Sequence, residues 1–255
     1  MWKQRVSTGV RSLAAGLTEV VFPPVCAFCE TGLRDDAAAA RRLCGDCRGG
    51  LVEPPTTRCR KCAARVAVTM RDDADCPWCR DHQLRFDRTF SLGSYHEQLR
   101  EAVLLLKRRG TEAPVHALAG ELWQRYGAEI AAEGIDVVVP VPMHWWRRMR
   151  RGWNAPELTA SLSAARLKVR DYPRLLVRRR ATKPQSGLTA TERRENVRRA
   201  FAVRLGYQVR GANVLLVDDI LTSGATCSEA AATLKRAGAA KVVVAVFARA
   251  QGESK

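Results

Sequence analysis

The sequence has no long apolar run and none of the common glycine signatures of nucleotide-binding proteins. No stretch approaches 18 uncharged apolar residues, so no segment is expected to span a membrane. The P-loop pattern G-x-x-x-x-G-K-[ST] is absent, and so is the G-x-G-x-x-G fingerprint of dinucleotide-binding folds. Any phosphate site in this chain must therefore be of another kind.

Acidic residues and lysine are both scarce beside arginine. The 255 residues include 43 Lys and Arg against 26 Asp and Glu, which gives a net charge of +17. Only 8 of the basic residues are lysine. Such a charge predicts attraction to nucleic acid, phosphorylated small molecules or anionic membranes. Because arginine- and alanine-rich sequences also arise from genomic base composition, charge alone does not identify the partner.

The first 24 residues carry basic side chains and apolar residues at roughly helical spacing. Charges interrupt this pattern too often for a secretory signal, and no A-x-A cleavage site follows. We expect an amphipathic helix over 1–24 that packs on the rest of the chain, and a cytoplasmic protein.

Cysteine dominates the next segment, 25–86. Eight of the nine cysteines form four C-x-x-C pairs, and two such pairs can complete a tetrahedral shell of sulfur around Zn²⁺. Disulfides conflict with a cytoplasmic location, and ferredoxin-type spacings are absent. The pattern predicts two structural Zn²⁺ ions, with the pairs combined either sequentially or in an interleaved way. The expected ligands are Cys26, Cys29, Cys44, Cys47, Cys59, Cys62, Cys76 and Cys79.

From about residue 87 to residue 250, apolar strands alternate with helical patterns. Strands are expected at 89–95, 137–141, 175–177, 201–203, 214–217 and 242–247, with helices at 96–107, 115–132, 154–166 and 226–237. Several strands are apolar throughout, which is typical of a parallel sheet covered by helices on both faces. The predicted fold class is α/β, and ligands bind such sheets at the carboxyl ends of the strands.

One stretch of this domain, Val214–Thr226, has the layout of a phosphate cradle. It reads V-L-L-V-D-D-I-L-T-S-G-A-T: an apolar strand, two carboxylates, and a loop of small residues before a helix. Backbone N–H groups and the helix dipole at such a loop favour an anion, whereas the acids suit hydroxyl groups or a cation. A ribose 5-phosphate satisfies both halves.

This stretch resembles the PRPP (phosphoribosyl pyrophosphate) motif of type I phosphoribosyltransferases. The resemblance makes Asp218 and Asp219 the catalytic candidates, which would hold the ribose. It adds to them a loop of PRPP ligands: Leu221, Thr222, Ser223, Gly224, Ala225 and Thr226.

The middle of the domain is strongly basic, with a net charge of +12 over residues 147–199. In its first part, tryptophans alternate with arginines, as in surfaces where bases stack and cations follow a single strand. The same residues could clamp a pyrophosphate or form a solvated face. The candidates are Arg147, Arg148, Arg150, Arg151, Gly152 and Asn154.

The segment Arg178–Phe201, called the hood here, combines loop residues with a short helical run from about Thr191. Such a segment is typical of a mobile cover that closes over a substrate. Its candidate contacts are Thr182, Gln185, Leu188, Arg193 and Asn196.

Taken in order, the motifs resemble the ComF family of competence-associated proteins, which join a double zinc ribbon to a phosphoribosyltransferase-type domain. The resemblance rests on the four cysteine pairs, P-V-P after a strand, R-G-W-N, T-K-P-Q-S-G-L, R-R-E-N-V and V-D-D-I-L-T-S-G-A-T. Trp153, where a phenylalanine is usual, and an alanine-rich insertion at Ala37–Ala40 depart from the pattern. The resemblance implies PRPP with Mg²⁺ as ligand, single-stranded DNA as partner and a role in DNA uptake alongside other uptake proteins.

Three functions remain open at this point. The first is a phosphoribosyltransferase, which transfers the pentosyl group of PRPP to an unidentified acceptor, or a PRPP-cleaving enzyme. The second is a binding protein for single-stranded DNA with PRPP as ligand or regulator. The third is a zinc-ribbon interaction module on an inactive scaffold, against which the intact acidic pair and loop argue.

Overall fold

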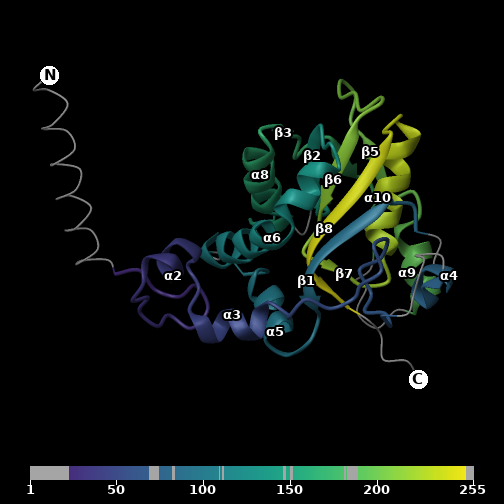
Figure 1. Cartoon of the computed structure of the whole chain (residues 1–255). Coiled ribbons are helices and arrows are strands. Elements are labelled where there is room, and N and C mark those ends of the chain that lie inside the picture. Colours follow the sequence, from purple (N-terminus) through teal and green to yellow (C-terminus); the bar gives the residue numbers. More distant parts are fainter. Residues whose placement is uncertain are drawn as a thin grey trace, which may run out of the picture.

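The structure is a computed structural model that describes residues 23–68, 75–81, 84–108, 110, 112–145, 148–149, 152–180, 182 and 189–250. Its centre is a six-stranded parallel sheet in the order β1-β8-β6-β2-β3, with β7 paired to β8 (Figure 1). The strands are β1 (Arg88–Ser94), β2 (Val137–Pro140), β3 (Arg170–Asp171), β6 (Asn213–Val217), β7 (Ile220–Leu221) and β8 (Lys241–Arg249).

Helices cover both faces of this sheet. Helices α5 (Glu97–Leu105), α6 (Glu112–Ala132) and α8 (Ala155–Leu167) cover one face, and α10 (Ala225–Arg236) lies on the other (Figure 1). Each face of the sheet has its own hydrophobic core. In β6, Leu215 packs in the core under α5, α6 and α8, and Leu216 packs in the core under α10, because successive side chains of a strand point to opposite faces. The continuous apolar runs of the sequence are therefore explained by burial on both sides, as predicted.

Two strands expected in this sheet lie elsewhere. Strands β4 (Leu176–Arg178) and β5 (Phe201–Val203) pair antiparallel with each other and form a separate two-stranded sheet at the base of the hood. Helix α9 (Ala190–Val197) lies between them in the sequence and begins with a capping box in which Thr189 and Glu192 bond each other's backbone N–H. The short strands β3 and β7 carry only two residues each and were not predicted.

The cysteine-rich segment divides into two parts that contact different sides of the domain. The first contains α2 (Asp36–Arg41) and α3 (Gly45–Leu51), and Arg48 of α3 donates to Glu121 of α6 at 3.0 Å. The second ends in α4 (Pro77–Asp81) and lies along β1, where the Thr89 N–H donates to the Arg60 carbonyl at 2.8 Å. Figure 1 shows α2 and α3 at one end of the molecule and α4 at the other.

The amphipathic helix expected over 1–24 lies almost wholly outside the described residues. Among the described helices, none is both long and apolar enough to cross a membrane.

Candidate functional site

The eight cysteines of the four pairs gather into two sets of four. One set is Cys26, Cys29, Cys44 and Cys47, and the other is Cys59, Cys62, Cys76 and Cys79; within each set all sulfur atoms lie within 4.8 Å of one another. The pairing is thus sequential, which the spacing alone had left open. Zn–S bonds of about 2.3 Å in a tetrahedron place the sulfur atoms about 3.8 Å apart. The Sγ–Sγ distances of 3.6 Å for Cys29 to Cys44, 3.6 Å for Cys59 to Cys79 and 3.7 Å for Cys62 to Cys76 fit this value.

Each set contains a cysteine that favours the thiolate before any metal is bound. A hydrogen bond with Thr31 lowers the pKa of Cys29 to about 6. Hydrogen bonds with Cys59 and Cys79 lower the pKa of Cys62 to about 4. Burial raises the pKa of Cys47, and the hydrogen bond with Cys59 raises the pKa of Cys79, so the thiols of each set do not ionise alike. Four close sulfur atoms nevertheless fit a structural Zn²⁺, which would fix the two C-x-x-C turns of each ribbon in place.

The acidic pair and the small-residue loop lie at the carboxyl edge of the parallel sheet. Asp218 and Asp219 follow β6 directly, and the loop continues through β7 to the start of α10. Gly224 caps α10 with a φ of 76°, a conformation that suits glycine because other residues are strained there. The first turn of a helix presents N–H groups without intrahelical acceptors, so this end of α10 favours an anion.

The surroundings of the Asp218 carboxyl group disfavour its ionised form. Burial, with the neighbouring charge of Asp219 as the second cause, raises its pKa well above the ordinary value for aspartate. Its Oδ1 accepts from the Asp219 N–H at 2.9 Å, and its Oδ2 accepts from the Cys227 thiol at 3.6 Å. Burial likewise raises the pKa of Cys227, which supports a packing role for this ninth cysteine. The pair therefore favours a ligand that brings hydroxyl groups or a cation.

An open cavity of about 610 Å³, called the loop cavity here, brings most of these residues together. Predicted site residues from three separate segments line it: Asn154, Arg193, Asp218, Asp219, Leu221, Thr222, Gly224 and Thr226. Ser223 and Ala225 face a second hollow on the other side of the loop. The cavity thus combines two acids, the loop at the start of α10 and basic side chains within one space.

Several predicted contacts do not reach the loop cavity. Arg148 is exposed and pairs with Glu157, and Gly152 has a φ of 64° but does not line the cavity. In the hood, Thr182 accepts a hydrogen bond from Arg178, and the Asn196 carbonyl accepts from Arg180 at 3.0 Å. Arg147, Arg150, Arg151, Gln185 and Leu188 lie outside the described residues.

The cavity also contains residues that the sequence analysis missed. Tyr95 follows β1 at the same sheet edge as the loop, Lys107 follows α5, and Arg178 ends β4. The position of Tyr95 was open to prediction, because residues that follow parallel strands meet at one edge. Arg178 begins the predicted hood, but no local signal singles out Arg178 or Lys107 from the basic residues that follow each of them. Together with Arg193 they supply three cations that belong to no single motif, so the fold assembles the basic part of the site.

Comparison with known proteins agrees with this architecture. Residues 17–83 match the double zinc ribbon domain family, and residues 157–255 match the phosphoribosyl transferase domain family. The DNA utilization protein YhgH of Escherichia coli K12 is 31% identical over 231 residues, which cover 86% of this chain and 88% of that protein. Competence protein F of Haemophilus influenzae is 31% identical over 116 residues, 45% of this chain and 51% of that protein.

The chain belongs to the ComF family. Solved structures with some similarity to this ComF-family chain include the adenine phosphoribosyltransferase of Leishmania donovani, with 17% identity over 61% of this chain and 70% of that one and a TM-score of 0.35. The purine phosphoribosyltransferase of Pyrococcus horikoshii has 14% identity over 52% and 73%, with a TM-score of 0.33.

The sequential cysteine pairing predicts how metal content responds to paired substitutions. Elemental analysis should find about two zinc ions per wild-type chain. Cys29→Ser with Cys44→Ser alters one set only, so about one zinc should remain. Cys29→Ser with Cys62→Ser alters both sets, so both ions should be lost. In an interleaved arrangement, the first C-x-x-C pair would share a metal with the third, and the second with the fourth. Cys29→Ser with Cys62→Ser would then keep one zinc ion, and Cys29→Ser with Cys44→Ser would lose both.

The raised pKa of Asp218 predicts that this carboxylate lowers stability at neutral pH. Its folded pKa lies above the unfolded value, so the folded state binds the proton more tightly and loses stability as pH rises past the ordinary aspartate range. Asp218→Asn should raise the melting temperature at pH 7.5 without ligand, because it removes a buried charge that also repels Asp219. The expected rise is roughly 2–4 °C for each kcal/mol gained in the free energy of unfolding. The gain should shrink as pH falls. Asp171→Asn, on β3 away from the cavity, is the control; an equal gain there would contradict the assignment.

Proposed function

We propose that the loop cavity binds PRPP, with the ribose on the acidic pair and the 5-phosphate on the loop before α10. The observation that carries this proposal is that one cavity contains the acidic pair, three cations from separate elements and part of the loop before α10. The loop residues that line it are Thr222, Gly224 and Thr226. PRPP has the matching parts: a diol, a monophosphate and a pyrophosphate. The family membership supports the same ligand class.

Each part of the cavity then has a distinct task. The carboxylates of Asp218 and Asp219 accept hydrogen bonds from the ribose diol and stabilise positive charge that develops on the ring. Lys107, Arg178 and Arg193 neutralise the pyrophosphate. The carboxylate oxygens are also ligands that Mg²⁺ prefers, and when bound with PRPP this ion supplies further neutralisation of the pyrophosphate.

The chemistry that this arrangement favours is cleavage at C1 of the ribose. The C1–O bond to pyrophosphate breaks, the electron pair leaves with pyrophosphate, and an acceptor or water forms the new bond to C1. Positioning and charge stabilisation would supply the rate acceleration. The acceptor is not identified, so the chain is either a phosphoribosyltransferase or PRPP-cleaving enzyme of nucleotide metabolism, or a protein in which PRPP acts as regulator.

We propose further that the chain handles single-stranded DNA, in DNA uptake or utilization within the cytoplasm. The names of its relatives, DNA utilization protein and competence protein, support this role. A second observation is a groove of about 730 Å³ between α9, α10 and residues 84–85, called the basic groove here. Six basic and two acidic side chains line it, and Arg85, Arg194, Arg198, Arg199 and Arg236 are exposed. Such a groove suits a phosphate backbone.

The PRPP assignment predicts a specific loss when the acids are neutralised. With Mg²⁺ present, PRPP should raise the melting temperature of the wild-type protein. Asp218→Asn with Asp219→Asn should weaken PRPP binding at least about tenfold, because the diol loses charged acceptors. Asp171→Asn is the matched control. Calorimetry measures the affinity, and pyrophosphate release, with and without single-stranded DNA, tests for turnover. Unchanged stabilisation in the double variant would reject the site.

The basic groove predicts a localised effect on DNA binding. We expect weaker salt dependence of binding to a single-stranded oligonucleotide in the triple variant Arg194→Gln, Arg198→Gln and Arg236→Gln. The slope of log K against log salt concentration should fall in magnitude by about 0.7 for each phosphate that the protein no longer neutralises. Arg166→Gln, Lys168→Gln and Arg170→Gln remove the same charge from exposed positions at the end of α8 and in β3, and should change the slope little. Equal effects would show that net charge alone attracts DNA. Charge reversal at Arg147, Arg148, Arg150 and Arg151 tests the alternative surface.

A further inference from the structure

Arg249, the last residue of β8, joins the second zinc ribbon to the loop that lines the cavity. Its side chain is buried, with 3% exposed. Its Nε donates to the Cys62 carbonyl at 2.8 Å, and its Nη1 donates to the Leu221 carbonyl at 3.1 Å and to the Thr222 carbonyl. One planar guanidinium group therefore contacts a predicted zinc ligand on one side and two loop residues on the other.

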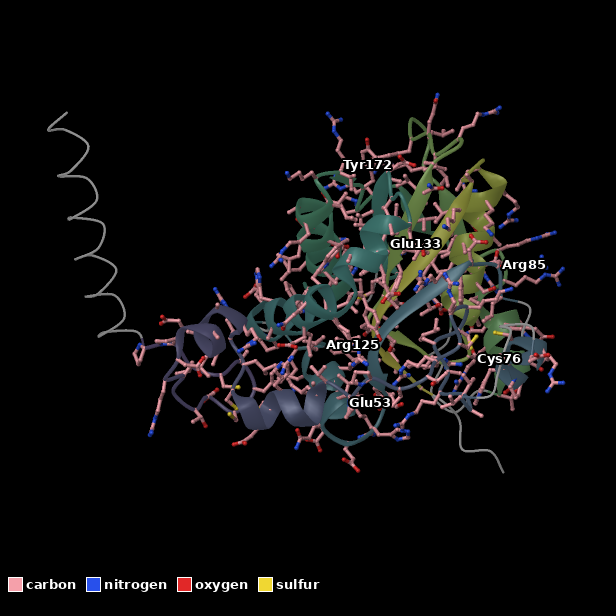
Figure 2. All side chains as sticks on the ribbon, viewed as in Figure 1. Glu53, Cys76, Arg85, Arg125, Glu133 and Tyr172 are labelled. Carbon is pink, nitrogen blue, oxygen red and sulfur yellow. The ribbon has the colours of Figure 1, made fainter. Side chains whose placement is uncertain are left out.

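The aromatic ring of Trp78 covers the same guanidinium group. The Arg249 Cζ lies 5.1 Å from the ring centroid, and Trp78 belongs to α4 between Cys76 and Cys79 of the second cysteine set. Figure 2 shows Cys76 beside α4, on the same side of the molecule as Arg85. Both halves of the second ribbon thus contact Arg249, Cys62 by its carbonyl and Trp78 by its ring.

The chain that leaves the ribbon also packs on the loop. A side-chain Cβ added at Gly224 would lie 2.8 Å from the Leu84 Cδ2, so Leu84 fills the space beside the cap of α10. The Arg85 N–H donates to the Ser228 Oγ in the first turn of α10 at 3.1 Å. The residues that follow the second ribbon therefore contact the start of α10 at two places, in addition to the contact through Arg249.

We propose that Arg249 is a positioning residue through which metal binding in the second cysteine set holds the loop Leu221–Thr226 in its ligand-binding form. The inference rests on the proposed function for its ligand, PRPP, but the coupling itself concerns the loop. The first cysteine set lies against α5 and α6, away from the loop, and should have no such effect.

The physical basis is the need of a buried guanidinium for acceptors. Within the described part of the chain, Arg249 forms no ion pair with a carboxylate, so backbone carbonyls satisfy it. The position of the Cys62 carbonyl depends on the turn of its C-x-x-C pair, which four sulfur ligands would fix. A metal with four thiolates also carries net negative charge, which the cation of Arg249 offsets. Without the metal the turn is released, and Arg249 loses the acceptor that sets its position.

Hydrogen exchange of the full-length protein without PRPP tests the coupling directly. Cys76→Ser with Cys79→Ser removes the second metal and keeps Cys62 itself, and Cys44→Ser with Cys47→Ser removes the first as the matched control. In the Cys76→Ser, Cys79→Ser variant we expect amide exchange over residues 220–226 to rise about tenfold. In the control variant, exchange should stay within about twofold of wild type. Equal loop exchange in both variants would overturn the proposal.

Arg249→Met gives an independent test, because it keeps all eight cysteines. It can therefore be measured even if the Cys76→Ser, Cys79→Ser variant fails to fold. Loop exchange should rise about tenfold in Arg249→Met with both metals still bound. Combined with Cys76→Ser and Cys79→Ser, it should add little to the effect of either change, since both break the same connection. Additive effects would mean that Arg249 and the metal stabilise the loop separately, and would overturn the proposal.

Calorimetric titration with PRPP and Mg²⁺ then separates this inference from the proposed function. PRPP affinity should fall about tenfold in Arg249→Met and in the second-set variant, and should be unchanged in the first-set control. If the wild-type protein binds no PRPP while the exchange pattern holds, the ligand is wrong and the coupling stands. If PRPP binds all variants equally, the coupling to the site is refuted.

Discussion

Strand β8 is the element on which the rest of the structure depends, because it forms hydrogen-bonded ladders with β1, β6 and β7. Eight of its nine residues are buried, so its apolar side chains supply both cores of the domain. Its parallel pairing with β6 places Asp218 at the sheet edge, since the Asp218 N–H donates to the Ala245 carbonyl at 3.1 Å. The same strand aligns Tyr95, whose N–H donates to the Arg249 carbonyl at 2.9 Å. Ladder formation alone thus brings Asp218 and Tyr95 to one edge of the sheet.

The acidic pair of the site is electrostatically unfavourable without a ligand, because burial and the neighbouring carboxyl group oppose ionisation of Asp218. Two adjacent carboxyl groups stand at a strand end, one of them with a pKa raised by burial, and three basic side chains line the same cavity. The described residues thus place charge of both signs around open space. Functional sites commonly sacrifice stability in this way, because the ligand supplies the missing partners. The cost of the acidic pair is consistent with the proposal that a hydroxyl-rich ligand completes it.

The sequence predicted those parts of the fold that depend on local pattern. The cysteine pairs, the apolar strands and the Val214–Thr226 stretch each carry their signal within a few residues, and the structure places them as expected. The sequential choice of cysteine sets was not predictable, because spacing fits both arrangements. The separate β4–β5 sheet was missed because three apolar residues do not reveal their partner strand. Lys107, Arg178 and Arg249 were missed for the same reason: each acquires its role beside a distant part of the chain, and nothing near it in the sequence distinguishes it from the many other basic residues.

The packing of Leu84 against Gly224 has a consequence for substitutions at this junction. Leu84 belongs to the segment that leaves the cysteine-rich module, and Gly224 belongs to the loop before α10, yet the two residues share one space. A larger residue at 224 would have to adopt a strained positive φ, and its Cβ would displace the end of the Leu84 side chain. A substitution in the domain is therefore felt in the segment that joins it to the module.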